Sequence, residues 1–351
     1  MLISFVLLCF IIACTPQTVT KIEEFAAQPI PKEALELTGK ALVDYVNQRQ
    51  SFFKAEYSPE VAEYRLGNLM KAHFVKQPRE EGYELTTEQL LANNSDLPEN
   101  FDSRDQWKDC PSLRYIRDQT KCGSCWAVSA ASVMSDRLCI HTKGKVKTML
   151  SDTDILACCG KFCGYGCEGG YNGRAWKWAT ISGVVSGGRY GEKGVCMPYV
   201  FHPCGSHKNQ RFYGVCPTHS YRTPACKPYC QYGYGKRYMK DKVKAKTWYY
   251  LPQKDEEAIK AEIFQRGPVH ATFNVYEDFA SYKGGVYIHT AGKMKGGHSV
   301  KIIGWGVENG TKYWTIANSW SEDWGENGGY FRVVRGIDNC YIESGVLAGT
   351  F

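Results

Sequence analysis

The sequence predicts an α+β protein with two lobes, a helical lobe followed by a strand-rich lobe, behind an N-terminal segment. A run of apolar and small residues at 126–134 directly follows Cys125 and is typical of a buried helix. Beyond about residue 245, apolar and polar residues alternate as they do in strands, and Ser299–Ile302 is one such stretch. Because substrates usually bind in clefts between lobes, we expect the functional site there.

The first residues have the pattern of a secretory signal peptide, which we place at residues 1–15. The run Leu2–Ala13 is almost entirely apolar, yet it is too short to span a bilayer. Its end, Ile11–Cys14, also resembles a bacterial lipoprotein site, an alternative that we rank below simple cleavage. No later apolar run is long enough for a membrane helix. We therefore expect a protein of the secretory pathway, lysosomal or secreted, without membrane contact after removal of the signal.

Cysteine content and charge indicate the compartment of the protein and exclude one class of partner. Sixteen cysteines are too many for a reducing cytosol and favour the oxidising pathway, in which disulfides form. Sequons at Asn93 and Asn309 are candidate glycosylation sites, although each also suits a plain surface turn. The net charge of +7 is spread along the chain without a block of like charges, so no nucleic-acid partner is expected.

A change in character near residue 96 predicts a domain boundary. Residues 16–96 are polar and free of cysteine, and Leu42 and Val46 fall on one face of a predicted helix. The turn-forming sequence Asn93–Pro98 ends this stretch, and all but two of the sixteen cysteines follow it. We therefore expect residues 16–96 to be a removable pro-segment and residues 97–351 to be the mature domain.

The segment from Gln119 to Trp126 carries the strongest chemical signal. Cys125 opens the predicted buried helix, where the helix dipole favours the thiolate, which is the attacking form. The sequence Cys-Gly-Ser-Cys-Trp within it resembles the signature of papain-family cysteine peptidases. This resemblance implies that Cys125 is the nucleophile and that Gln119, with the backbone N–H of Cys125, stabilises the oxyanion. A Cys-x-x-Cys thiol oxidoreductase and a purely structural cysteine pair are the alternatives, but no β-α-β pattern surrounds Cys122 and Cys125.

A second pattern, Gly296-Gly297-His298, places a histidine at the start of a predicted strand behind glycines that allow close backbone approach. Asn318, twenty residues further along, matches the family residue that orients the catalytic imidazole. The resemblance also implies that Trp320 shields this hydrogen bond from water. His298 is therefore the expected acid-base partner of the nucleophile.

The resemblance is strongest to cathepsin B-like peptidases, and it extends from Leu42–Asn47 in the pro-segment to Ile342–Ser344. It implies a papain-like fold with a helical left lobe, a β-barrel-like right lobe and the active-site cleft between them. It also implies a cysteine-type peptidase that hydrolyses protein and peptide substrates through a thiolate-imidazolium pair, without a metal or another cofactor. A catalytically silent binding or matrix protein is the alternative, and it is disfavoured because the full catalytic set is present.

Four closely spaced cysteines, Cys158, Cys159, Cys163 and Cys167, could in isolation bind zinc. Secretion makes disulfides the stronger interpretation, but spacing alone cannot choose their connectivity. The cathepsin B pattern implies six bonds and leaves Cys125 and Cys340 free. The implied bonds are Cys110–Cys139, Cys122–Cys167, Cys158–Cys226, Cys159–Cys163, Cys196–Cys230 and Cys204–Cys216.

The resemblance identifies residues 196–230 as the region of the occluding loop, which blocks one end of the cleft in cathepsin B. In that family, two adjacent histidines in the loop receive the C-terminal carboxylate of the substrate, and the enzyme is a dipeptidyl carboxypeptidase. Here Ser206 stands at the first histidine position and only His207 remains. The missing histidine pairs in the family with the aspartate corresponding to Asp118. We therefore expect a less firmly closed loop and a gain of endopeptidase over exopeptidase activity.

A second departure concerns the pocket for the side chain two residues before the cleaved bond. The family's acidic residue in that pocket aligns with Gly345, and Ser299 replaces a usual alanine. Without the carboxylate the pocket loses the ion pair that favours arginine, so we expect Phe, Leu or Val there. The remaining substrate contacts implied by the resemblance are Gly169, Gly170, Tyr171, Gly297, Trp320 and His207.

The stretch Tyr313–Trp320, continued by Asp323–Glu326, resembles a motif of cathepsin B-like enzymes from blood-feeding worms. It implies a digestive enzyme of the gut lumen that acts on haemoglobin. Lysosomal protein degradation is the other role that we consider. Cystatin-like inhibitors are the protein partners implied by the family.

Overall fold

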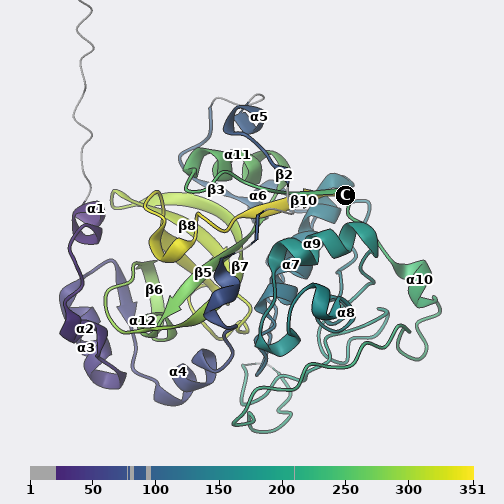
Figure 1. Ribbon diagram of the computed structural model, residues 1–351, viewed down its shortest axis with the longest axis horizontal. Helices are drawn as coiled ribbons and strands as arrows, with labels where there is room; N and C mark the ends of the chain where they lie inside the picture. Colours follow the sequence, from purple (N-terminus) through teal and green to yellow (C-terminus); the bar gives the residue numbers. More distant parts are fainter. Residues whose placement is uncertain (1–20, 77, 80–82, 92–95, 209) are drawn as a thin grey trace, which may run out of the picture.

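The computed structural model describes residues 21–76, 78–79, 83–91, 96–208 and 210–351 (Figure 1). The predicted signal peptide at 1–15 and the sequon at Asn93 lie outside these residues. Within the described residues, no helix has the length and apolar character needed to cross a membrane.

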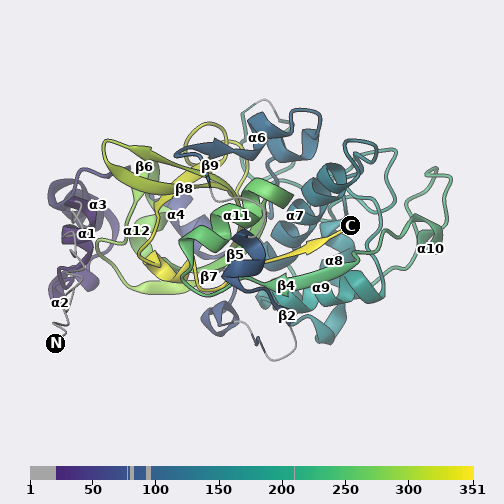
Figure 2. The same cartoon turned by 90° about the horizontal axis from the view of Figure 1, so that it is seen from above.

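The described part of the N-terminal segment, within residues 21–96, runs along the outer side of the sheet and then passes between the sheet and the helices that face it (Figures 1 and 2). The face of α3 that carries Leu42, Val43 and Val46 is buried against the core of the strand-rich lobe, so the predicted amphipathic helix is confirmed. Its elements are α1 (Lys21–Ala26), α2 (Lys32–Leu35), α3 (Gly39–Arg49), β1 (Phe53–Ala55), α4 (Pro59–Leu66), the 3-10 helix η1 (Ala72–Val75), β2 (Tyr83–Glu84) and α5 (Thr87–Leu91).

The helical lobe is built around α7 (Cys125–His141), and the buried helix predicted after Cys125 is confirmed. Every side chain from Cys125 to Cys139 is buried, because alanines and serines along the helix let neighbouring elements approach from all sides. The other elements between the N-terminal segment and residue 181 are β3 (Phe101–Asp102), α6 (Ser103–Gln106), η2 (Pro111–Arg114), α8 (Asp152–Cys158), η3 (Gly160–Phe162), η4 (Gly166–Glu168) and α9 (Asn172–Ile181).

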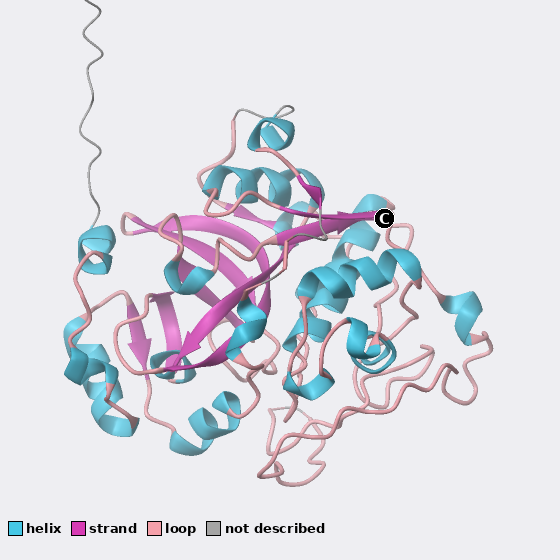
Figure 3. Cartoon of the chain, viewed as in Figure 1, coloured by secondary structure: helices cyan, strands magenta, loops and turns pink. Residues whose placement is uncertain are grey.

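The strand-rich lobe, called the β lobe below, occupies the opposite half of the molecule (Figure 3). Its strands follow the order β1-β6-β9-β8-β7-β5-β10-β4-β2, with β3 added beside β7. This sheet is open, so the β-barrel-like lobe expected from the family resemblance is corrected to an open sheet. Its elements are β4 (Thr247–Tyr250), α11 (Glu256–Arg266), β5 (Val269–Tyr276), α12 (Glu277–Ala280), β6 (Tyr282–Tyr287), β7 (Met294–Glu308), β8 (Thr311–Ala317), β9 (Tyr330–Val334), η5 (Asn339–Tyr341) and β10 (Leu347–Thr350). The short helix α10 (Tyr238–Asp241) lies at the far edge of the helical lobe, where the Tyr238 hydroxyl donates to Asp154 of α8 (Figures 1 and 2).

Both ends of this sheet are strands of the N-terminal segment. β1 pairs with β6 in antiparallel fashion, and β2 pairs with β4 in parallel fashion. Edge strands expose unpaired N–H and C=O groups that can recruit another chain. The N-terminal segment therefore covers the edges of the sheet as well as the cleft.

The central strand β7 differs from the alternation seen in the sequence. Val300 and Ile302 are buried in the β-lobe core as predicted, but Ser299 and Lys301 on the other face are buried too. The reason is that this second face of β7 packs against α7 of the helical lobe. The Lys301 ammonium is paired there with Asp136 of α7, at 2.7 Å between Nζ and Oδ2.

The long loop between Cys196 and Cys230 contains no helix or strand in its described part and is held by disulfides instead. The structure contains the six disulfides implied by the resemblance, and Cys125 and Cys340 are free thiols. The pairs are Cys110–Cys139, Cys122–Cys167, Cys158–Cys226, Cys159–Cys163, Cys196–Cys230 and Cys204–Cys216.

A fully buried ion pair joins the two lobes. Arg137 of α7 donates to Glu262 of α11 at 2.8 Å, and both side chains have no exposed surface. Burial raises the pKa of Glu262, but Arg137 and Arg266 outweigh it and leave that pKa below its ordinary value. Arg137 also donates to the backbone carbonyls of Gly267 and Gly349, so its guanidinium ties three separate segments together.

Replacing Glu262 with glutamine should lower the free energy of unfolding by about 3–5 kcal/mol, because it leaves the buried guanidinium of Arg137 without its counter-charge. The loss should persist from neutral pH to below the ordinary glutamate pKa, since the folded-state pKa is lowered and Glu262 stays ionised there. Urea unfolding of the full chain in a Cys125→Ala background measures it.

The matched control is Glu257→Gln on the same helix. Glu257 pairs with Lys260 at 2.9 Å, but its side chain is 53% exposed. An exposed pair of this kind contributes little, so the control should stay within about 0.5 kcal/mol of the parent. Equal losses in the two variants would contradict the role assigned to the buried pair.

Candidate active site

Cys125 lies at the first position of α7, where the helix faces β7 of the other lobe. One turn along, the hydroxyl of Ser129 donates to the backbone carbonyl of Ser299 at 2.8 Å and holds helix and strand together. Burial raises the pKa of the Cys125 thiol to about 11, although the N–H groups of Ser299 and Trp126 favour the thiolate. The thiol is therefore neutral in this form of the protein.

His298 is held on β7 by Asn318, which follows β8. Its Nε2 donates to the Asn318 side-chain oxygen at 2.7 Å, and the backbone N–H of Ser319 donates to the same oxygen at 2.8 Å. The ring of Trp320 lies 4.8 Å from the imidazole, centre to centre. Within the described residues, Nδ1 of His298 has no hydrogen-bond partner, which leaves it available to a thiol. Burial lowers the pKa of His298 to about 4, and the bond to Asn318 offsets this only in part.

The amide of Gln119 is fixed by its neighbours before any substrate binds. Its oxygen accepts from the Ser319 hydroxyl at 2.7 Å, so its nitrogen must be the donor. That nitrogen donates to the carbonyls of Asn68 and Cys122 at 2.8 and 2.9 Å. Next to it, Thr120 has a φ of 52°, which is unusual for a β-branched residue and is typical of strain held at functional sites. Ser319 was not identified from the sequence, although it adjoins Asn318.

The N-terminal segment fills the space between these groups. Met70 forms a two-residue antiparallel bridge with Gly297, with N···O distances of 3.0 and 2.9 Å. Asn68, two residues earlier, supplies the carbonyl that Gln119 binds. A side chain at Gly297 would collide with Val75, which explains why glycine is required beside His298. The segment thus covers the thiol, the imidazole and the amide donor together.

The opposite wall of the cleft is formed by Gly169, Gly170 and Tyr171, which precede α9. A side chain at Gly169 would meet the ring of Phe74, which in turn lies 4.9 Å from the ring of Tyr171. A side chain at Gly170 would meet the indole of Trp126. Gly169 therefore lets the N-terminal segment lie close to the backbone of the helical lobe, and Gly170 lets that backbone lie close to the Trp126 ring.

Gly345 and Ser299, expected in the pocket for the second residue before the cleaved bond, lie on either side of Thr272. Thr272 is paired with Ser299 across β5 and β7, and a Cβ on Gly345 would come within 2.3 Å of the Thr272 hydroxyl. The Ser299 hydroxyl donates to the Asn172 side chain at 3.0 Å. Thr272 and Asn172 had no sequence signal, because only tertiary contacts bring them to these residues.

His207 is held by partners on both sides of its ring. Its Nδ1 lies 2.9 Å from Asp323, its Nε2 lies 2.9 Å from the carbonyl of Cys204, and Asp118 is 3.7 Å from Nε2. These partner atoms are acceptors, so both bonds form only with the doubly protonated ring. Burial raises the pKa of Asp118, and His207 works against that rise.

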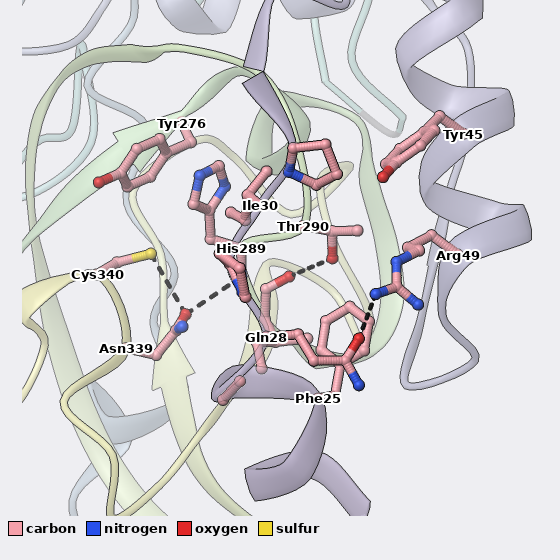
Figure 4. Close-up of a pocket in the computed structure, with 14 residues that line it drawn as sticks. Phe25, Gln28, Ile30, Tyr45, Arg49, Tyr276, His289, Thr290, Asn339 and Cys340 are labelled. Carbon is pink, nitrogen blue, oxygen red and sulfur yellow. Dashed lines mark hydrogen bonds between the residues drawn. The ribbon is translucent and has the colours of Figure 1, made fainter. Parts of the chain in front are cut away.

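The structure also places three other sequence candidates. Asn309 is exposed in the turn between β7 and β8. Cys122 is bonded to Cys167, so it does not form a free dithiol with Cys125, and the four cysteines that could have bound zinc are all in disulfides. The free thiol of Cys340 lies in a pocket between the N-terminal segment and the β lobe, opposite Arg49 (Figure 4).

Residues 97–350 match the family model described as "Papain family cysteine protease". This chain belongs to the papain family of cysteine proteases. It is a cysteine peptidase that acts on protein or peptide substrates, and the alternative of a catalytically silent binding or matrix protein has no support from the relatives. The family match covers the region that holds Cys125, His298, Asn318 and Gln119.

Curated relatives narrow the resemblance to cathepsin B-like enzymes. "Cathepsin B-like cysteine proteinase 1" of Ostertagia ostertagi is 45% identical over 327 residues, which cover 93% of this chain and 94% of the relative. "Gut-specific cysteine proteinase" of Caenorhabditis elegans is 49% identical over 313 residues, with 89% and 91% covered. Among solved structures, "proCathepsin B S9 from Trypanosoma congolense" is 37% identical, has a TM-score of 0.72, and aligns over 90% of this chain and 98% of that one.

In the full chain, iodoacetamide should alkylate Cys125 at least about a hundredfold more slowly at pH 7 than in enzyme from which the N-terminal segment has been removed. Only the thiolate reacts, and the raised pKa keeps the thiol protonated up to about 11. The rate in the full chain should therefore climb steadily from neutral to alkaline pH. Timed quenching and peptide mapping by mass spectrometry measure it.

Full chain unfolded in urea provides the reference, because its free thiols have ordinary reactivity. Equal alkylation rates in the folded full chain and the processed enzyme, at matched pH, would contradict the inference that the N-terminal segment suppresses the thiolate.

Proposed function

We propose that Cys125 attacks the scissile carbonyl as a thiolate paired with the imidazolium of His298. The backbone N–H of Cys125 and the side-chain amide of Gln119 stabilise the oxyanion. His298 then protonates the leaving amine and later activates water against the thioester, while Asn318 keeps its ring in place. The observation that carries this proposal is the 2.7 Å hydrogen bond from Nε2 of His298 to Asn318, which leaves Nδ1 for the thiol.

We propose that residues 16–96 are an inhibitory pro-segment and that the mature enzyme begins near Leu97, after a signal peptide at 1–15. The bridge between Met70 and Gly297 supports this, because it occupies backbone groups beside His298. The bond from Gln119 to the carbonyl of Asn68 occupies an oxyanion donor as well. A substrate cannot reach these groups until the segment leaves.

We propose that the processed enzyme is chiefly an endopeptidase with little dipeptidyl carboxypeptidase activity. Dipeptide release in the family needs a free histidine donor for the substrate carboxylate. Here both nitrogens of His207, the only histidine left at the tip of the loop, are already engaged by Asp323 and by the carbonyl of Cys204. The loop is tied to the cleft by the side chain that would otherwise dock the substrate.

The test incubates the processed enzyme at acidic pH with one peptide, made either with a free or with an amidated C-terminus. Mass spectrometry follows the products. Internal cuts of similar rate in both forms are expected, with at most a minor yield of C-terminal dipeptide. Dipeptides released mainly from the free acid would contradict the endopeptidase assignment and make His207 a carboxylate dock. Cys125→Ala is the control, and cutting by it would overturn the role of the nucleophile.

Replacing Ser206 with histidine restores the missing donor while His207 keeps its own partners. Dipeptide release from the free-acid peptide should then rise about tenfold, the scale of one charge-assisted hydrogen bond. Ser206→Gln is the matched control, since it adds bulk and a neutral donor at the same place. No difference between the two variants would count against the carboxylate-dock explanation.

We propose that the pocket for the second residue before the cleaved bond prefers Phe, Leu or Val over Arg. The hydroxyls of Thr272 and Ser299 are neutral, and Gly345 supplies no carboxylate to pair with a guanidinium. Thr272 moreover occupies the space that a side chain at position 345 needs. An acidic residue at position 345 is therefore disfavoured by Thr272 as well as missing from the sequence.

Processed enzyme should hydrolyse a Phe-Arg substrate at least about tenfold faster in kcat/KM than the matched Arg-Arg substrate, the scale of one lost ion pair. Gly345→Glu alone should improve Arg-Arg turnover little, because Thr272 crowds the new side chain. Gly345→Glu with Thr272→Ala should reverse the preference. Comparable turnover of the two substrates by the parent enzyme would contradict the proposal.

We infer a digestive or lysosomal setting for this peptidase in the secretory pathway. The gut-specific relative in Caenorhabditis elegans and the six disulfides support export through an oxidising compartment. The motif at Tyr313–Trp320 favours haemoglobin as one substrate, and cystatin-like proteins are the inhibitors to examine first. A glycan at Asn309 fits its exposed turn.

A further inference from the structure

The guanidinium of Arg79, in the N-terminal segment, occupies a site built mostly by the peptidase domain. The Cζ atom of Arg79 lies 4.7 Å from the centre of the Tyr250 ring, over the ring face. Its Nη1 donates to the carbonyl of Ser344 at 3.0 Å, and its Nη2 donates to the carbonyl of Leu251. The side chain of Arg79 is only 20% exposed. An aromatic face and two converging carbonyls are the surroundings that suit a planar, delocalised cation.

Most of this site stays behind when the N-terminal segment leaves. Tyr250 ends β4, Leu251 follows it, and the N–H of Leu251 donates to Val346 at 3.1 Å, which fixes the two backbone segments against each other. Of the polar contacts of Arg79, the one to Glu84 at 2.9 Å is supplied by the N-terminal segment itself, from β2. The ring and the two carbonyls therefore remain, and they lose the cation that now covers them.

The site lies beyond the pocket proposed for the second residue before the cleaved bond. Ser344 directly precedes Gly345, and the Thr272 hydroxyl donates to the carbonyl of Val75 at 3.4 Å. Arg79 follows Val75 by four positions, a span of about 13 Å in an extended chain. The segment passes Gly297 at Met70 before it reaches Thr272 at Val75, so it runs from the catalytic groups toward the pocket. A substrate whose second residue before the cleaved bond lies in that pocket must run in the opposite direction, and its residues further toward the N-terminus reach the Arg79 site.

We propose that the processed enzyme uses this site as an additional substrate subsite that binds an arginine about four positions before the residue in the Gly345 pocket. The subsite rests on the proposed peptidase function and deepens it by naming a second specificity determinant. Arginine fits better than lysine, because its flat fork can lie on the Tyr250 ring while donating to two carbonyls at once. Long extended substrates with a basic residue upstream are favoured over short ones.

The test compares peptides that share one cleavable core, with Phe in the pocket position, and an N-terminal extension of small neutral residues. Arginine, lysine or citrulline, which is a neutral analogue of the same shape, is placed at successive positions of the extension. Arginine should raise kcat/KM over citrulline about tenfold at one position, mainly through KM, with lysine in between. An arginine advantage of the same size at every position, or at none, would overturn the subsite.

The core peptide without an extension separates this inference from the function on which it rests. If the enzyme fails to cut that core, the proposed peptidase function fails. If it cuts the core but shows no arginine advantage at any position, only the subsite fails. Raising the salt concentration should leave most of the advantage in place, since the ring contact and the carbonyl bonds are short-range.

Two variants of Tyr250 provide the structural control. Tyr250→Phe keeps the ring face and should keep the arginine advantage, whereas Tyr250→Leu removes the face and should abolish most of it. The readout is the ratio of arginine to citrulline turnover within one preparation, so a lower yield of active enzyme does not affect it. An unchanged ratio in Tyr250→Leu would overturn the role of the ring. If Tyr250→Leu does not fold, the peptide series with the parent and Tyr250→Phe decides the proposal by itself.

Discussion

The chemistry of this chain depends on a fixed relation between its two lobes, because the thiol and the imidazole come from different lobes. Cys125 opens α7, and His298 lies on β7. The buried pair of Asp136 and Lys301 joins the same helix to the same strand, only three residues beyond His298. A second buried pair, from the adjacent Arg137 to Glu262, joins the same helix to α11. Charges buried in this way are costly to separate, so the lobes keep their register.

The N-terminal segment controls this site through solvent as well as through space. By covering the cleft, it buries Cys125 and His298, and burial disfavours the charged form of both. The reactive form of a papain-family peptidase is a thiolate-imidazolium pair, so the N-terminal segment suppresses formation of this pair as well as blocking access to it. The same segment supplies both edge strands of the sheet, so its removal would open the cleft, the two edges and the Tyr250 site together.

Local patterns were sufficient wherever one element or one motif carried the information. The apolar run after Cys125 predicted α7, and the alternation around Val300 predicted β7. The proposed catalytic set followed from motifs as well, because Cys125, His298 and Asn318 each stand in a short stretch that resembles a motif of the family. Cysteine spacing could not predict the disulfide connectivity, which came only from resemblance to a family.

The sequence by itself determined the elements, the chemical groups and the family, because these depend on neighbours along the chain. Only the tertiary structure decided which groups are buried and what they meet. Ser299 and Lys301 are the polar members of the alternating pattern, yet both are buried, since a strand at a lobe interface is covered on both sides. His270, also on that interface, is fully buried, and this burial lowers its pKa to about 3. The residues that bind His207 and those that form the site of Arg79 likewise come from segments far apart in the chain, and no local pattern encodes them.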